Sequence, residues 1–167
     1  DNAVNAKVNG KWVGLSTKEA KEQGDNCSAG LLQLGVEAGD KIAVISSTNR
    51  TEWVLADFGM SQIGAINIPI YPTISSEDYA YILNHAEATY CFVSDKEVLD
   101  KVRAIESQCT NLKGVYSFDK IKGCDHFESL LSKKPTKAQT DEIKTRKSNI
   151  KSEDLATIIY TSGTTGK

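Results

Sequence analysis

Apolar residues along this chain occur in two spacings that alternate with each other. Short runs of consecutive apolar residues are followed by longer segments in which apolar residues recur at every third or fourth position. The first spacing is typical of buried strands, and the second is typical of amphipathic helices. Strands that alternate with helices of this length predict βαβ units, a mostly parallel sheet with flanking helices and therefore an α/β fold.

The expected strands are short runs rich in β-branched or aromatic residues, and they cover 41–45, 65–68, 90–93, 115–118 and 155–160. The expected helices each start at a polar capping residue, at Ser16, Asn49, Ser75 and Asp95. Ser16 with Glu19 is expected to make a capping box, and Ser75 with Asp78 is expected to start a helix. Leu155 to Tyr160 is expected to be a buried, central strand of the sheet.

Two segments depart from this alternation. Asn9-Gly10 separates two short stretches within residues 6–13, which predicts a hairpin with a type I′ turn. Residues 132–154 are rich in lysine, serine, threonine and acidic residues. We expect a solvated polar connection there, at most a frayed helix, before the last strand. A basic membrane-surface segment is the alternative, but acidic residues dilute its charge and no aromatic anchor is present.

Composition narrows the class of protein. A length of 167 residues fits one domain with a hydrophobic core, and the net charge of −2 gives no basic surface for nucleic acid. The sequence contains no apolar stretch long enough to span a bilayer and no signal-peptide pattern. The four cysteines, at 27, 91, 109 and 124, form no Cys-x-x-Cys pair. We therefore expect free thiols in a reducing cytoplasm rather than disulfides or a zinc site.

Residues 161–166, Thr161, Ser162, Gly163, Thr164, Thr165 and Gly166, carry the clearest chemical signal. They follow the expected strand 155–160, so they would lie at the carboxyl edge of a parallel sheet, where ligands bind. Their hydroxyl groups and their unhindered glycine N–H groups are suited to binding phosphate. Two residues separate the glycines where a Walker loop has four, which excludes that motif. A generic polar loop is the alternative interpretation.

The string YTSGTTGK at 160–167 resembles the phosphate-binding signature of the adenylate-forming family, which includes acyl-CoA synthetases, luciferases and peptide-synthetase adenylation domains. In that family the TSGTTG string is followed by any residue and then Pro-Lys-Gly, so Lys167 occupies the variable position. Residues 39–73 resemble the long-chain fatty acid–CoA ligase branch of the family. The matching residues are Asn49, Arg50, Glu52, Trp53, Pro69, Tyr71, Pro72 and Thr73.

The resemblance implies part of the large amino-terminal domain of an enzyme that uses ATP, Mg²⁺ and coenzyme A. Such an enzyme joins a fatty acid to ATP, releases pyrophosphate, and transfers the acyl group from the adenylate to coenzyme A. The resemblance assigns phosphate binding to residues 161–166, and it assigns no catalytic residue and no metal ligand within this chain. Medium-chain or aromatic acids are the alternative substrates, and a non-enzymatic α/β nucleotide-binding module is the alternative function.

Residues 1–167 are accordingly expected to form a single α/β subdomain of a longer ligase and to be inactive alone. The remaining site residues of the family would lie after Lys167. An unpaired strand edge would then favour association of two copies. We expect a cytoplasmic protein with at most peripheral membrane contact and no nucleic-acid partner.

The 39–73 matches have a structural interpretation that we favour over direct contact with substrate. Asn49 is expected to cap a helix, Trp53 to be a large buried anchor, and Pro69 to end the 65–68 strand. His85 is expected to be a structural histidine on a packed helix, and the resemblance assigns it no role.

Overall fold

A computed structural model describes residues 2–8 and 10–161. Five parallel strands form one sheet in the order β4–β3–β5–β6–β7. They are β3 (Lys41–Ile45), β4 (Ile66–Ile70), β5 (Tyr90–Val93), β6 (Gly114–Ser117) and β7 (Asp125–His126). The predicted α/β class is confirmed. The short strand β7 had no apolar run from which it could be predicted.

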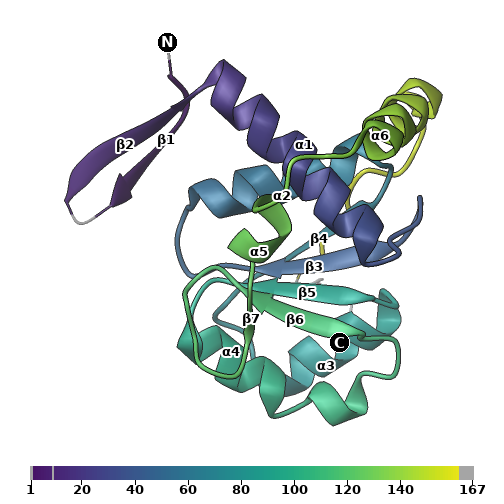
Figure 1. Ribbon diagram of the computed structural model, residues 1–167. Helices are drawn as coiled ribbons and strands as arrows, with labels where there is room; N and C mark the ends of the chain where they lie inside the picture. Colours follow the sequence, from purple (N-terminus) through teal and green to yellow (C-terminus); the bar gives the residue numbers. More distant parts are fainter. Residues whose placement is uncertain (1, 9, 162–167) are drawn as a thin grey trace.

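Helices cover both faces of the sheet (Figure 1). One face carries α1 (Thr17–Gln33), α2 (Thr51–Gln62), α5 (Glu128–Leu131) and α6 (Lys137–Asn149). The other carries α3 (Ser76–His85), α4 (Lys96–Arg103) and the 3₁₀ turn η1 (Glu106–Gln108). Successive side chains of a strand point to opposite faces, so Ile42 and Val44 join one apolar cluster while Ala43 and Ile45 join the other.

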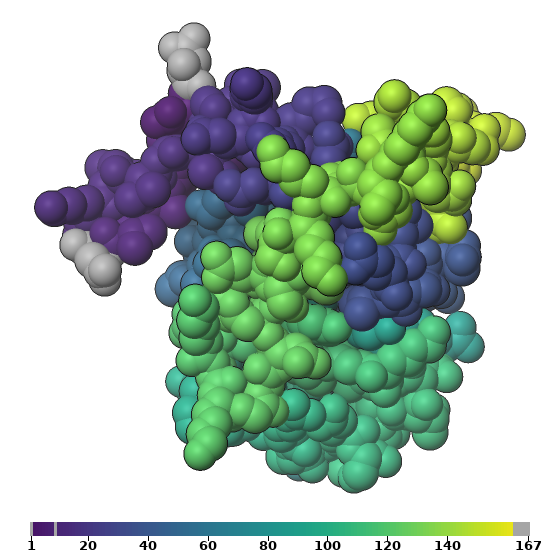
Figure 2. Space-filling model, in the orientation of Figure 1, coloured from purple at the N-terminus to yellow at the C-terminus, as the bar shows by residue number. Residues whose placement is uncertain are grey.

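A hairpin of β1 (Asn2–Val8) and β2 (Lys11–Ser16) extends away from the sheet (Figures 1 and 2). Val8 pairs with Lys11, so the connection has two residues, and Gly10 has a φ of 80°. Positive φ at this position is what a type I′ turn requires, which supports the predicted hairpin. The hairpin leaves Trp12 73% exposed.

Three of the four predicted helix caps are present. Ser16 and Ser75 form capping boxes with Glu19 and Asp78, and the Asp95 side chain accepts from the Val98 N–H. The predicted cap at Asn49 is wrong, because α2 begins two residues later. Arg50 is the residue before the helix, with an extended backbone and no side-chain capping bond.

The predicted polar connection at 132–154 contains a regular helix, α6, rather than a frayed one. Thr136 and Gln139 form a capping box that starts it. Ile143 is buried, and the Arg146 guanidinium donates to the Val36 carbonyl (3.2 Å) and to Glu37 Oε2 (2.7 Å). Gln139 Nε2 also donates to the Ala29 carbonyl (3.2 Å). One buried apolar position with a few polar contacts docks α6 on the body, and such a pattern is too sparse to predict from periodicity. None of the helices in the described part of the chain is long and apolar enough to cross a membrane.

Pro69 does not end β4, which continues to Ile70. Within a strand the N–H and C=O groups of successive residues point to opposite sides, so those of residues i and i+2 share a side. Ile66 donates toward Asp40 at the start of β3, whereas Asn67 pairs with Thr157 on the outer side. Pro69 has the same orientation as Asn67, so its missing N–H is on the outer edge and the β3–β4 ladder stays complete.

The predicted central strand 155–160 is also wrong in its place and burial. The segment runs along the outer edge of β4 through one isolated bridge, between Asn67 and Thr157. Leu155 is 57% exposed and Ile159 is 60% exposed. The next outward-facing residue of β4 after Asn67 is Pro69, which cannot donate a hydrogen bond, so the pairing does not extend into a strand.

All four cysteines are free thiols, as expected. Cys27, Cys91 and Cys109 are buried. Burial raises the pKa of Cys27 to about 12, which keeps it protonated at neutral pH. Cys27 lies where α1 meets α2, and this contact depends on a glycine. A methyl group on Gly59 would come within 2.5 Å of the Cys27 sulfur.

We predict that Gly59→Ala lowers the free energy of unfolding by about 2 kcal/mol, because the added methyl group overpacks the α1–α2 contact. Gly24→Ala is the matched control in α1, since its added carbon would lie an ordinary 3.4 Å from Phe58. That substitution should stabilise the protein by up to about 1 kcal/mol through helix propensity. Urea denaturation measures both, and equal effects of the two substitutions would contradict this account of the contact.

Candidate functional site

The carboxyl ends of the parallel strands meet at one edge of the sheet, and several polar residues follow the strands there. The loop after β3 carries Ser46 and Ser47, and Ser94 follows β5. The Ser94 hydroxyl accepts from the Ser47 N–H (3.0 Å) and donates to Asp95 Oδ2 (2.6 Å). In open α/β sheets this edge is where ligands bind.

Of the predicted phosphate-binding residues, the structure describes Thr161, which is exposed. Ser162, Gly163, Thr164, Thr165 and Gly166 lie outside the described residues, and so does Lys167. The structure therefore describes the segment that leads to this loop, residues 155–161. Asn67 N–H donates to the Ala156 carbonyl and Ile158 N–H donates to the Asn67 carbonyl, both at 3.1 Å, which places the segment beside β4.

Side chains hold the end of this segment. Ile158 and Tyr160 pack against the apolar cluster under α3 and α4. The Tyr160 hydroxyl lies 2.7 Å from Nδ1 of His85, at the end of α3. The predicted structural histidine is thus hydrogen-bonded, although it lies on an exposed part of the helix. His85 and Tyr160 are 75 positions apart in the sequence, and no sequence pattern predicts their contact.

Arg50 connects three strand ends at the same edge. Its guanidinium donates to Glu52 Oε1 (2.7 Å), to Asp119 Oδ1 (2.7 Å) and to the Ser94 carbonyl (3.2 Å). Hydrogen bonding to Glu52 and Asp119 raises the pKa of Arg50 further above its usual value, although burial opposes this. Two carboxylates already neutralise this cation, so we interpret Arg50 as scaffold, in agreement with the sequence analysis.

The carboxylates described at this edge are occupied as well. Glu52 and Asp119 bind Arg50, and Asp95 accepts from the Ser94 hydroxyl and the Val98 N–H. Burial raises the pKa of Asp95, but these hydrogen bonds outweigh it and the net shift is downward. Among residues 2–8 and 10–161, no group of three or more His, Cys, Asp or Glu side chains could hold a metal ion.

Two cavities open near the edge. One, of about 540 Å³, lies between α2 and the ends of β3 and β4, and Trp53, Tyr71 and Ile159 contribute to its mostly apolar lining. Trp53, predicted to be a large buried anchor, is partly buried there and packs against the apolar cluster of this face. The other cavity, of about 610 Å³, lies between the hairpin and the body.

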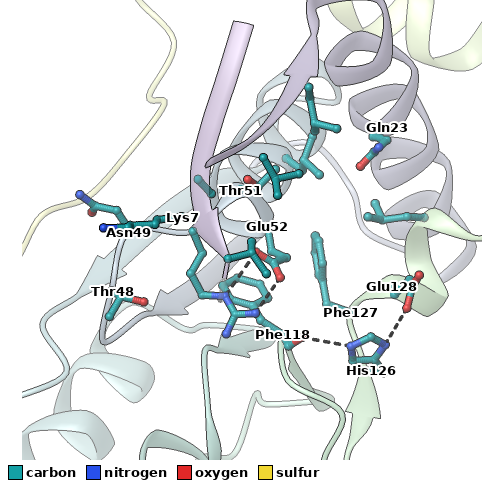
Figure 3. A pocket seen from close by; sticks show the side chains of 17 residues that line it. Lys7, Gln23, Thr48, Asn49, Thr51, Glu52, Phe118, His126, Phe127 and Glu128 are labelled. Atoms are coloured by element: carbon teal, nitrogen blue, oxygen red, sulfur yellow. Dashed lines mark hydrogen bonds and ion pairs between the residues drawn. The ribbon is translucent and has the colours of Figure 1, made fainter. Parts of the chain in front are cut away.

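Figure 3 shows the second cavity, with Lys7 on the hairpin and Glu52, Phe127 and Glu128 on the body. His126 Nε2 lies 3.0 Å from the Phe118 carbonyl, and its Nδ1 lies 3.5 Å from Glu128 Oε2. These polar groups bind one another across the floor of the cavity. The lining also includes the polar side chains of Lys7, Gln23, Thr48 and Asn49, which come from separate elements and do not by themselves identify a ligand.

Comparison with known proteins identifies the family. The family model described as AMP-binding enzyme matches residues 2–167. This chain belongs to the AMP-binding enzyme family. The match covers nearly the whole chain, as the resemblance of the 39–73 and 160–167 segments implied.

Curated members of the family similar to this chain include two long-chain fatty acid ligases. One is the long-chain-fatty-acid–CoA ligase FadD15 of Mycobacterium bovis, 32% identical over 96% of this chain and 26% of its own length. The other is the long-chain-fatty-acid–CoA ligase heimdall of Drosophila melanogaster, 30% identical over 95% of this chain and 24% of its own length. The chain thus spans about a quarter of these relatives.

Solved structures share the fold. The anthranilate CoA ligase AuaEII, crystallised with anthranoyl-AMP, aligns with a TM-score of 0.76 at 22% identity, over 92% of this chain and 28% of its own. The amino-terminal domain of FACL13 from Mycobacterium tuberculosis aligns with a TM-score of 0.72 at 21% identity, over 92% of this chain and 36% of its own. The predicted fold, that of the amino-terminal domain of adenylate-forming enzymes, is confirmed.

We predict that Arg50→Ala lowers the free energy of unfolding by about 2 kcal/mol, because it removes charged hydrogen bonds that join three strand ends. The Arg50 side chain is only 23% exposed, so solvent weakens these bonds little. Lys96→Ala, which breaks the exposed ion pair with Asp100, should change the free energy of unfolding by no more than about 0.5 kcal/mol. Equal losses in the two variants, measured by urea denaturation, would show that Arg50 does not connect the strands.

Proposed function

We propose that this chain is the phosphate-binding part of an ATP-dependent long-chain fatty acid–CoA ligase. The observation that supports the proposal is the course of residues 156–158 along β4 toward the carboxyl edge of the sheet, shortly before the TSGTTG string in the sequence, in a chain of the AMP-binding family. Two relatives with the fatty acid ligase name support the choice of branch. The acid substrate is a long-chain fatty acid, with medium-chain and aromatic acids as alternatives.

In this proposal residues 161–166 bind the β- and γ-phosphates of ATP. The hydroxyls of Thr161, Ser162, Thr164 and Thr165 and the N–H groups of Gly163 and Gly166 donate to phosphate oxygens. Donors that are already oriented stabilise the charge that develops as pyrophosphate leaves. The occupied carboxylates of the edge fit this use, because Glu52, Asp95 and Asp119 have their charge balanced by hydrogen-bond donors.

Mg²⁺ would enter with the nucleotide and neutralise part of the phosphate charge. We assign it no protein ligand in this chain. Fatty acid and coenzyme A are the other substrates of the proposed reaction, and the acyl-adenylate is its intermediate. We propose that the protein works in the cytoplasm with at most peripheral membrane contact.

The outer edge of the sheet bears on how the proposed subdomain, residues 1–167, associates. Leu155 and Ile159 lie exposed beside β4, where the backbone pairing stops after one bridge. Such an edge pairs readily with further protein. We propose that it is covered either by more of the same domain or by a second copy in a homodimer.

We predict that Thr164→Val and Thr165→Val, in the protein expressed from its complete gene, each slow adenylate formation on the order of a hundredfold. Each substitution keeps the shape of the side chain but removes a hydroxyl donor aimed at phosphate. Fatty acid binding should change little. ATP–pyrophosphate exchange measures the first quantity, and fluorescent fatty acid titration measures the second.

Thr17→Val is the matched control, because Thr17 is exposed at the start of α1. Its exchange rate should equal that of the wild type. Unchanged exchange in both loop variants would remove the assignment of these residues to phosphate binding.

A further inference from the structure

Backbone hydrogen bonds between residues 155–161 and β4 end just before the proposed phosphate-binding loop. In the described part of the chain, Ile158 makes the last backbone hydrogen bond before the loop, to the Asn67 carbonyl. The next outward-facing residue of β4 is Pro69, which has no N–H to offer to this segment. Within the described residues, the contacts that hold residues 159–161 are therefore made by side chains.

One side-chain contact lies at this point. The Tyr160 hydroxyl is 2.7 Å from His85 Nδ1, and the two rings meet edge to face with centroids 5.7 Å apart. Tyr81 also stacks on His85, with centroids 5.4 Å apart and planes at 24°. Tyr81 lies one helical turn before His85 on α3, so the imidazole contacts two aromatic rings, which restrict its orientation.

The hydroxyl in this contact is neutral. Burial, with a smaller contribution from Tyr81, raises the pKa of Tyr160, so it keeps its proton at physiological pH. A neutral hydroxyl can donate to an unprotonated Nδ1 or accept from a protonated one. The hydrogen bond therefore forms with either tautomer of His85.

From this geometry we infer that His85 is a positioning residue for the phosphate-binding loop and acts through the Tyr160 hydroxyl. The inference rests on the proposed function. His85 is at the end of a helix that packs on the sheet, and Tyr160 is adjacent to Thr161, the first proposed phosphate ligand. Fixing Tyr160 sets where the loop leaves the sheet, so the phosphate donors are placed before ATP arrives.

The test uses steady-state ATP–pyrophosphate exchange by the protein expressed from its complete gene. Tyr160→Phe keeps the ring and removes the hydroxyl, and His85→Leu removes the imidazole. Each should lower kcat/KM for ATP about fivefold, the effect expected from losing one hydrogen bond. The change should appear mainly in KM for ATP, with KM for the fatty acid unchanged, because the contact orders only the loop.

Two further variants separate positioning from general packing. His85→Asn should keep most of the wild-type kcat/KM for ATP, because the asparagine side chain can place a polar atom near the position of Nδ1. The double variant His85→Leu/Tyr160→Phe should be no worse than either single variant, since both remove the same contact. Tyr81→Phe is the matched control: its hydroxyl has no hydrogen-bond partner in the described part of the chain, and the stack on His85 remains.

The outcomes are distinct. If the wild-type protein catalyses no ATP-dependent exchange, the proposed function is contradicted, and so is the positioning role of His85 that rests on it. If the wild type is active while Tyr160→Phe and His85→Leu match it, only the positioning role of His85 is overturned. Equal rises in KM for ATP and for the fatty acid, or additive losses in the double variant, would also overturn it and show a contact that only stabilises the fold.

Discussion

The absent N–H of Pro69 is the constraint on which the arrangement of the candidate site depends. It faces the outer side of β4, so the sheet loses no internal hydrogen bond. On that outer side, however, it limits the pairing of the 155–160 segment to the bridge at Asn67. The chain is thereby aligned with the sheet and then released at the carboxyl edge, where the TSGTTG string begins. A full strand there would have carried the backbone pairing up to the loop itself.

After this point, side chains hold the segment that precedes the proposed phosphate-binding loop. Tyr160 and Ile158 pack on the cluster under α3 and α4, and His85 binds the Tyr160 hydroxyl. The scaffold behind them is rigid for separate reasons: Arg50 joins three strand ends, and the close contact at Gly59 holds α1 against α2. A loop that binds by orienting donors needs such a support, because donors that must reorganise stabilise charge less well.

The sequence predicted the parts of this structure that local chemistry determines. Apolar runs gave strands β3 and β5 with their observed bounds, and the capping boxes at Ser16 and Ser75 gave the helix starts. The errors arose where long-range contacts decide. Helix α6 has a single buried apolar residue, Ile143, and is also held by Arg146, so its sequence shows no helical periodicity. Helix α2 starts after Arg50 rather than at the predicted cap, Asn49. The apolar run 155–160 predicts an interior strand. Its observed position at the outer edge of β4 depends on Pro69, and the run itself carries no sign of this. The contact of His85 with Tyr160 joins distant residues and is visible only in three dimensions.

The most direct test of the account is amide hydrogen exchange of the protein expressed from its complete gene, with Mg²⁺ alone and with Mg²⁺ and saturating ATP. The account predicts that ATP slows exchange in peptides spanning 156–167, while peptides from α6 (137–149) are unchanged. Exchange in 156–167 that is the same with and without ATP, under conditions where ATP is bound, would contradict the claim that this segment binds its phosphates.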